Sequence, residues 1–201
     1  MHSPEYRKQN AGALRQDWPR IPLPVTLEQL QGSAELGRGV AALLNPEAPF
    51  TPTPELRKIG RIEKVGGGSP TPEDRRLTAA WGRKQGEAVM PGRGKTAATE
   101  GEFDAALGET ALRVHLNDNL YWENVPESVW TYSLGGYQVV KKWLSYREQD
   151  VLGRALNIEE IRYASSMFQR IASLLLLSKE LDASYTIAAS AEAQTPSAVE
   201  V

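Results

Sequence analysis

Apolar residues recur at helical spacing along residues 27–44, where leucine and valine occupy positions typical of one helix face. Thr26 precedes this segment and Gln29 follows three residues later, which is the arrangement of an N-terminal capping box. Asn45-Pro46 ends it, because proline donates no backbone hydrogen bond and crowds the preceding turn. The pattern predicts a helix over 27–44.

A stronger apolar stripe spans residues 158–179, with Asn157 and Glu160 as its N-terminal cap, and it predicts the longest helix and the centre of the core. A shorter helical pattern spans residues 137–148, after a pair of glycines. Its two sides differ, with Tyr137, Val140, Trp143 and Leu144 on one and Gln138, Lys141, Lys142 and Ser145 on the other.

The segments whose patterns predict β-strands are shorter than the predicted helices. Apolar and polar residues alternate over 110–116, and residues 61–65 form the strand of a glycine- and proline-rich region. Residues 130–134 form an extended aromatic run. Together with the helices, these segments predict an α+β fold of short strands and loops in the N-terminal and middle parts, followed by a helical C-terminal region.

The ends of the chain differ from the middle. Residues 1–25 are polar and contain X-Pro steps that favour extended or polyproline backbone, so we expect a connector there. Residues 26–187 form the expected domain. Residues 188–201 are small and polar with no basic residue, which predicts a disordered tail.

The amino-acid composition excludes several kinds of catalytic and metal site. The chain has 201 residues, no cysteine, two histidines and a net charge of −2, so thiolate catalysis, disulfides and cysteine-based metal sites are excluded. No segment approaches the roughly 20 apolar residues that span a bilayer, and no signal peptide is recognisable. We therefore expect a cytoplasmic protein without a membrane partner.

The near-neutral total charge hides two opposed regions. Residues 56–95 contain ten basic and four acidic side chains, a local net charge of +6, whereas residues 96–134 contain seven acids opposed by Arg113. Phosphate binding requires lysine and arginine on flexible or helix-terminal backbone, and base recognition requires side chains that reach groove edges. The candidate DNA-binding residues are Arg61, Lys64, Arg93, Lys95, Gln138, Lys141, Lys142 and Arg147.

A simpler interpretation applies to the residues of the predicted helix over 137–148. Lys141, Lys142 and Arg147 could form only the solvated side of an amphipathic helix, and the aromatic residues between 121 and 146 are more often core than a base-stacking platform. Arg93 and Lys95 are sharper candidates, because the glycines of this loop let its cations approach a phosphate closely.

Catalytic motifs are missing from this sequence. Gly94-Lys95-Thr96 ends like a phosphate-binding P-loop, but Val89 stands where that loop requires glycine. Asn45-Pro46-Glu47-Ala48 lacks the second proline and the aromatic residue of the amino-methyltransferase motif, and the carboxylate pairs are typical of solvated faces. We expect no enzymatic activity of this chain alone and no catalytic, cofactor-binding or metal-binding residue.

Several long and unusual motifs resemble one family, namely the C-terminal specificity domain of type ISP restriction-modification enzymes and related adenine-specific DNA methyltransferases. They cover most of residues 2–185: His2-Ser3-Pro4-Glu5-Tyr6-Arg7, Asp17-Trp18-Pro19-Arg20-Ile21-Pro22, Val89-Met90-Pro91-Gly92-Arg93-Gly94-Lys95, Leu116-Asn117-Asp118-Asn119, Tyr121-Trp122-Glu123-Asn124-Val125-Pro126, Val129-Trp130-Thr131-Tyr132, and the run from Gly135 to Glu148.

The resemblance implies a target-recognition domain that binds duplex DNA. In the parent family one polypeptide also carries a nuclease, a motor ATPase and an adenine-N6 methyltransferase, which use S-adenosylmethionine, ATP and Mg²⁺. Their motifs are not in this sequence, so no cofactor is expected here, and methylation or cleavage would come from a separate methyltransferase or nuclease polypeptide.

Two alternatives remain from the sequence. One is a docking module of a restriction-modification assembly that uses the apolar helix over 158–179 and the opposed charge patches. The other is a truncated gene remnant without independent activity.

Overall fold

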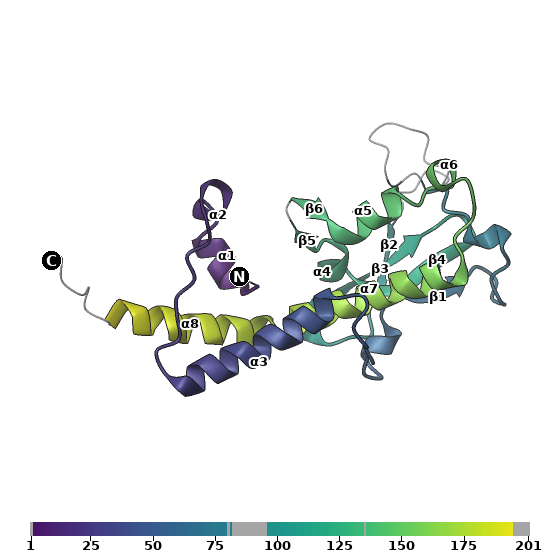
Figure 1. Cartoon of the computed structure of the whole chain (residues 1–201). Helices are drawn as coiled ribbons and strands as arrows, with labels where there is room; N and C mark the ends of the chain where they lie inside the picture. The colour runs from purple at the N-terminus through teal and green to yellow at the C-terminus, as the bar shows by residue number, and fades with distance from the viewer. Residues whose placement is uncertain (1, 80, 82–95, 135, 195–201) are drawn as a thin grey trace. The chain divides into compact units, whose positions relative to one another are not determined.

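The computed structural model describes residues 2–79, 81, 96–134 and 136–194 (Figure 1). Contacts divide the chain into two units. Unit 1 consists of residues 1–50 and 176–201, and unit 2 consists of residues 51–175. The predicted α+β class is confirmed, because a four-stranded antiparallel sheet is combined with long C-terminal helices.

The sheet of unit 2 is antiparallel throughout, in the order β1-β4-β3-β2. Its strands are β1 (Arg61–Lys64), β2 (Thr96–Glu100), β3 (Thr110–His115) and β4 (Leu120–Pro126). The strands predicted over 61–65 and 110–116 are confirmed, each ending one residue earlier than expected. The side chain of Asn117 shapes the β3–β4 turn by accepting hydrogen bonds from the backbone N–H groups of Asn119 and Leu120.

Helix α7 (Ile158–Leu176) forms the core together with the sheet. Its Phe168 ring meets Trp122 of β4 edge to face, with 5.8 Å between ring centroids. The predicted cap is confirmed, since Asn157 Oδ1 accepts from the Glu160 N–H and the Glu160 carboxylate accepts from the Asn157 N–H. The helix ends three residues before the predicted position 179.

Short elements precede the sheet, connect its strands and join it to α7. They are 3-10 helices at Leu56–Lys58, Glu73–Arg75 and Ala105–Leu107, then α4 (Glu127–Trp130), β5 (Ser133–Leu134), β6 (Tyr137–Gln138), α5 (Val139–Ser145) and α6 (Gln149–Leu152). The extended run predicted over 130–134 is wrong at Trp130, which ends α4 and is buried against Trp81. The helix predicted over 137–148 is shorter at both ends. It begins at Val139, because Tyr137 and Gln138 pair with β5, and it ends at Ser145.

Unit 1 is helical, with α1 (Pro4–Gln9), α2 (Ala13–Gln16), α3 (Leu27–Leu44) and α8 (Ser178–Gln194). The helix predicted over 27–44 is confirmed, and Thr26 caps it by accepting a hydrogen bond from the Gln29 N–H. Extended backbone was expected over residues 1–25, and residues 18–24 indeed contain no helix or strand. Residues 4–9 differ, because Ser3 caps α1 and Pro4 occupies its first turn, where proline is tolerated.

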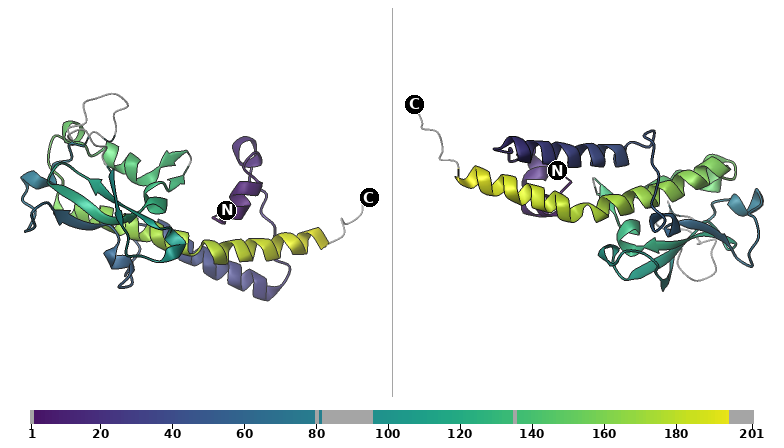
Figure 2. Two further views of the ribbon diagram at one scale, coloured as in Figure 1. Left: turned by 180° about the vertical axis from the view of Figure 1, so that it is seen from behind. Right: turned by 90° about the horizontal axis from the view of Figure 1, so that it is seen from below.

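The disorder expected over residues 188–201 is not found up to Gln194, where α8 ends, and residues 195–201 lie outside the described residues. The segment contains Ala188, Ala189 and Ala191, and alanine has the highest helix propensity. Asp182 on α8 also accepts hydrogen bonds from the Ser3 hydroxyl and the Glu5 N–H of α1. In both views of Figure 2, α8 lies beside α3, and the hydroxyl groups of Ser33 and Ser184 are 2.9 Å apart.

Candidate nucleic-acid interface

Helix α5 is oriented by its buried side. Val140 and Leu144 are fully buried in unit 2, and the Val139 N–H donates to the Tyr132 carbonyl, so Lys141 and Lys142 are exposed. Gln138 directly precedes the helix, and its side chain is half-buried. The local sequence therefore presents two adjacent ammonium groups to solvent next to an amide.

Lys142 lies between two exposed tyrosines. Its Nζ atom is 5.1 Å from the ring centroid of Tyr137 and 4.7 Å from that of Tyr146, and these residues are 63% and 59% exposed. A hydrogen bond to the Tyr146 hydroxyl raises the pKa of Lys142. The electron-rich ring faces hold the cation in place without neutralising its charge.

A second cation–aromatic pair follows on the same segment. The Arg147 guanidinium is 4.1 Å from the ring centroid of Trp143, which stacks on Tyr163 of α7 at 5.7 Å. Arg147 Nε also lies 3.8 Å from Glu160 Oε1, so its charge is partly compensated. The name aromatic–basic surface is used below for Tyr137, Gln138, Lys141, Lys142, Trp143, Tyr146, Arg147 and Tyr163. Gln138, Trp143 and Arg147 are half-buried, and the other five residues are exposed.

The candidates on β1 lie elsewhere and are paired with acids. Figure 1 shows β1 apart from α5. Arg61 Nε is 2.7 Å from Glu63 Oε1, and Lys64 Nζ is 2.6 Å from Asp74 Oδ2. Lys64 is therefore tied into the turn that contains Asp74.

Arg93 and Lys95 lie outside the described residues, but the point at which the chain enters that segment is clear. Trp81 is buried, its backbone N–H donates to the Glu148 carboxylate, and its indole N–H donates to the His115 carbonyl at 3.1 Å. Glu148 directly follows Arg147, so the backbone N–H of Trp81 lies next to the end of the aromatic–basic surface.

Four of the eight predicted residues thus share one surface, namely Gln138, Lys141, Lys142 and Arg147. Sequence reasoning placed Tyr137 on the apolar side of a helix, whereas it lies in β6 and is exposed. The i,i+4 spacing of Lys142 to Tyr146 and of Trp143 to Arg147 was a signal for these pairs.

Other kinds of site find no support in the described part of the chain. No group of three or more histidine, aspartate or glutamate side chains there could hold a metal ion. None of the described helices is long and apolar enough to cross a membrane. The apolar stripe of α7 is buried in unit 2 at Ile161, Phe168 and Ile171, so it is not an open docking face.

Unit 2 is thus an α+β domain that carries an aromatic and basic surface. In the comparison with protein families, residues 1–171 match the family described as the type ISP C-terminal specificity domain. The chain belongs to that family. Comparison with curated proteins and with solved structures gives no match.

Proposed function

We propose that this domain binds duplex DNA through the aromatic–basic surface and selects the sequence at which another polypeptide methylates or cleaves. The family's description as a specificity domain supports a role in target recognition. Lys142 carries the proposal, because it is exposed, positioned by two tyrosines and not paired with an acid among the described residues. An uncompensated cation of this kind replaces counterions on the DNA backbone.

The polar and basic residues of the surface have proposed roles. Lys141 and Lys142 contact base edges and the phosphates that flank them, and Gln138 reads a base edge through its amide, which can both donate and accept. Arg147 supports the surface through Trp143. Arg61, Arg93 and Lys95 contact phosphates, and Lys64 does so only when its ion pair with Asp74 is broken.

The first test is selection from a pool of short duplexes of mixed sequence at two salt concentrations, followed by sequencing of the bound fraction. We expect one enriched motif and weaker binding at the higher salt concentration. Salt-sensitive binding without an enriched motif would reduce the proposal to a basic patch. No binding at low salt would overturn it.

Substitutions then test the surface. Lys142→Ala should reduce the slope of log affinity against log salt by about one. Lys179→Ala on α8 removes the same charge outside the surface and should leave the slope unchanged. Gln138→Ala should relax the enriched motif at one position and keep the slope. Equal slopes for the Lys142 and Lys179 variants would contradict this site.

A double variant tests the basic segment that follows Trp81. Replacing Arg93 and Lys95 together by alanine should weaken binding to all sequences to a similar extent and reduce the salt slope by about two. An unchanged slope would remove these two residues from the interface and leave the α5 proposal intact.

A further inference from the structure

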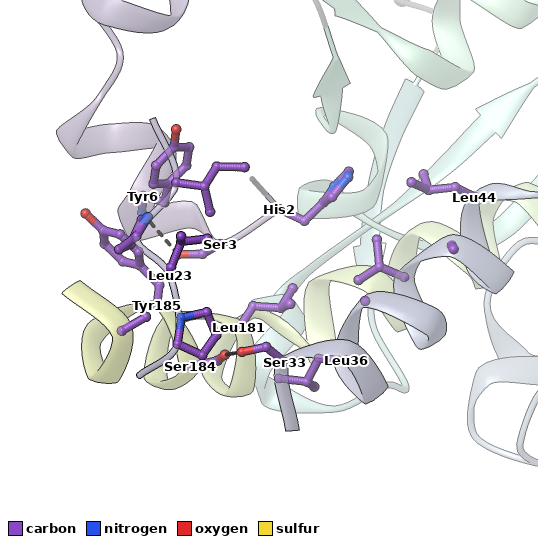
Figure 3. A pocket seen from close by; sticks show the side chains of 17 residues that line it. His2, Ser3, Tyr6, Leu23, Ser33, Leu36, Leu44, Leu181, Ser184 and Tyr185 are labelled. Carbon is purple, nitrogen blue, oxygen red and sulfur yellow. Dashed lines mark hydrogen bonds between the residues drawn. The ribbon is translucent and has the colours of Figure 1, made fainter. Parts of the chain in front are cut away.

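Unit 1 contains a groove between α3 and α8 with a volume of ≈ 600 Å³. Its floor consists of small and apolar residues, namely Gly32, Ser33, Leu36, Ser184, Ile187 and Ala188. Ile187 is 51% exposed there. A hydrogen bond between Ser33 and Ser184 joins the two helices at this floor. Both residues and Leu36 also line a neighbouring pocket of unit 1 that contains His2 and Tyr6, and Figure 3 shows them from that side.

The glycines of α3 have no packing role within unit 1. Gly32, Gly37 and Gly39 lie inside the helix, where each glycine costs about 1 kcal/mol relative to alanine. A Cβ atom added at any of the three would meet nothing within 4 Å. Gly32 and Gly39 are seven residues apart and therefore share one helix face, along which another backbone could approach closely.

The rim of the groove is acidic. Glu28 and Glu35 on α3 and Glu180 on α8 line it, and none of them forms an ion pair with another described residue. Arg38 and Lys179, the cations nearest in sequence to Glu35 and Glu180, are not among its lining residues. Three uncompensated carboxylates beside an apolar floor are complementary to an apolar segment flanked by cations.

We propose that the α3–α8 groove binds an amphipathic helix of a partner polypeptide whose apolar face is flanked by lysine or arginine. An apolar groove between two helices can bind a third, amphipathic helix. The apolar residues of that helix at positions i, i+3, i+4 and i+7 then fit into the groove. This binding is independent of the DNA-binding proposal, because none of its residues lies in the aromatic–basic surface.

The test uses the full chain and two fluorescent model peptides as long as α3, with the same leucine–alanine face. One peptide has lysines on both flanks and the other has glutamates. The lysine peptide should bind on the order of tenfold more tightly. The variant Glu28→Lys/Glu35→Lys/Glu180→Lys should reverse this preference, and circular dichroism would check that its helical content is unchanged.

A second variant tests the floor without altering charge. Gly32→Leu should stabilise α3, because leucine is a better helix former, and should weaken binding of the lysine peptide about tenfold by filling the groove. Lys142→Ala should leave peptide binding unchanged, which separates this proposal from the DNA site.

Three outcomes would overturn the proposal. They are no binding of either peptide, equal binding of both, and a preference that the charge-reversed variant retains. Concentration-dependent self-association that Ile187→Asp abolishes would also overturn it, by identifying a second copy of this chain as the occupant of the groove.

Discussion

Asp74 illustrates how a single residue fixes a loop. It is 8% exposed and accepts hydrogen bonds from Lys64 Nζ and from both the backbone N–H and the hydroxyl of Thr71. The hydrogen bond from Lys64 is the largest cause that lowers the pKa of Asp74 from 3.8 to about 2. The carboxylate is therefore the form that the folded chain stabilises.

This shift predicts a pH dependence of stability. A carboxylate with a lowered pKa contributes fully above its unfolded pKa of 3.8 and loses its contribution as the pH falls toward its folded value of about 2. Asp74→Asn should therefore lower the melting temperature at pH 7, and its difference from the unsubstituted chain should shrink between pH 4 and pH 2. Thermal unfolding followed by circular dichroism measures both.

Asp118→Asn is the matched control, because Asp118 lies exposed in the β3–β4 turn. It should change the melting temperature little at any pH. A constant difference between Asp74→Asn and the unsubstituted chain from pH 7 to pH 2 would contradict the role assigned to the ionised carboxylate.

Residue-scale prediction succeeded where the interaction is local. The caps at Thr26 and Asn157 were predictable because the partner backbone N–H lies three residues ahead in the sequence. The environment of Lys64 was not, because Asp74 lies ten residues away across a glycine-rich loop. The basic sequence pattern suggested that Lys64 binds phosphate, but in the fold its ammonium group is already bound to the carboxylate of Asp74.

At the scale of elements, Gly60 lets the sheet and α7 approach each other. Its φ is +64°, and an added Cβ would lie 2.5 Å from Phe168 Cδ2. Gly60→Ala should therefore destabilise the chain by about 3 kcal/mol, through left-handed backbone strain and overpacking combined. Urea denaturation gives the free energy of unfolding.

Gly67→Ala separates the two causes. Gly67 has a φ of +79°, but a Cβ there would meet nothing within 4 Å, so the cost should be about 1 kcal/mol from backbone strain alone. If the two variants lost equal stability, close packing against Phe168 would not be the reason for glycine at position 60.

Element prediction failed mainly where the pattern was weak or interrupted. β3 was recognisable from its alternation, whereas β2 is an edge strand rich in alanine and threonine with no large apolar residue. α5 was predicted two residues too early, because pairing of β6 with β5 extends the chain at Tyr137 and Gln138. That pairing depends on contacts across a turn, which helical periodicity does not encode.

At the scale of the whole molecule, the two units differ in how much they bury. The buried apolar residues of unit 1 within the described chain are Tyr6, Val40 and Ala188, whereas unit 2 buries Trp122, Phe168 and many more. Local opening should therefore cost less free energy in unit 1. Amide hydrogen exchange should be faster in α3 than in β3 and β4.

Mass spectrometry of exchanged peptides measures this difference. Addition of the lysine-flanked peptide should slow exchange in α3 and α8 and leave β3 and β4 unchanged, because a ligand protects the state that binds it. Exchange in α3 as slow as in β4 without peptide would contradict the assignment of lower stability to unit 1.

The hydrogen bond between Ser33 and Ser184 joins residues that are 151 positions apart in the chain. During synthesis, α3 leaves the ribosome long before α8, and all of unit 2 is made in between. Closing so long a loop carries an entropic cost that a preformed unit 2 reduces by bringing the two segments closer together. The apolar side of α3 is therefore exposed in the nascent chain until α8 has been synthesised. If synthesis stopped within α8, α3 would remain exposed and the product would be prone to aggregation and proteolysis.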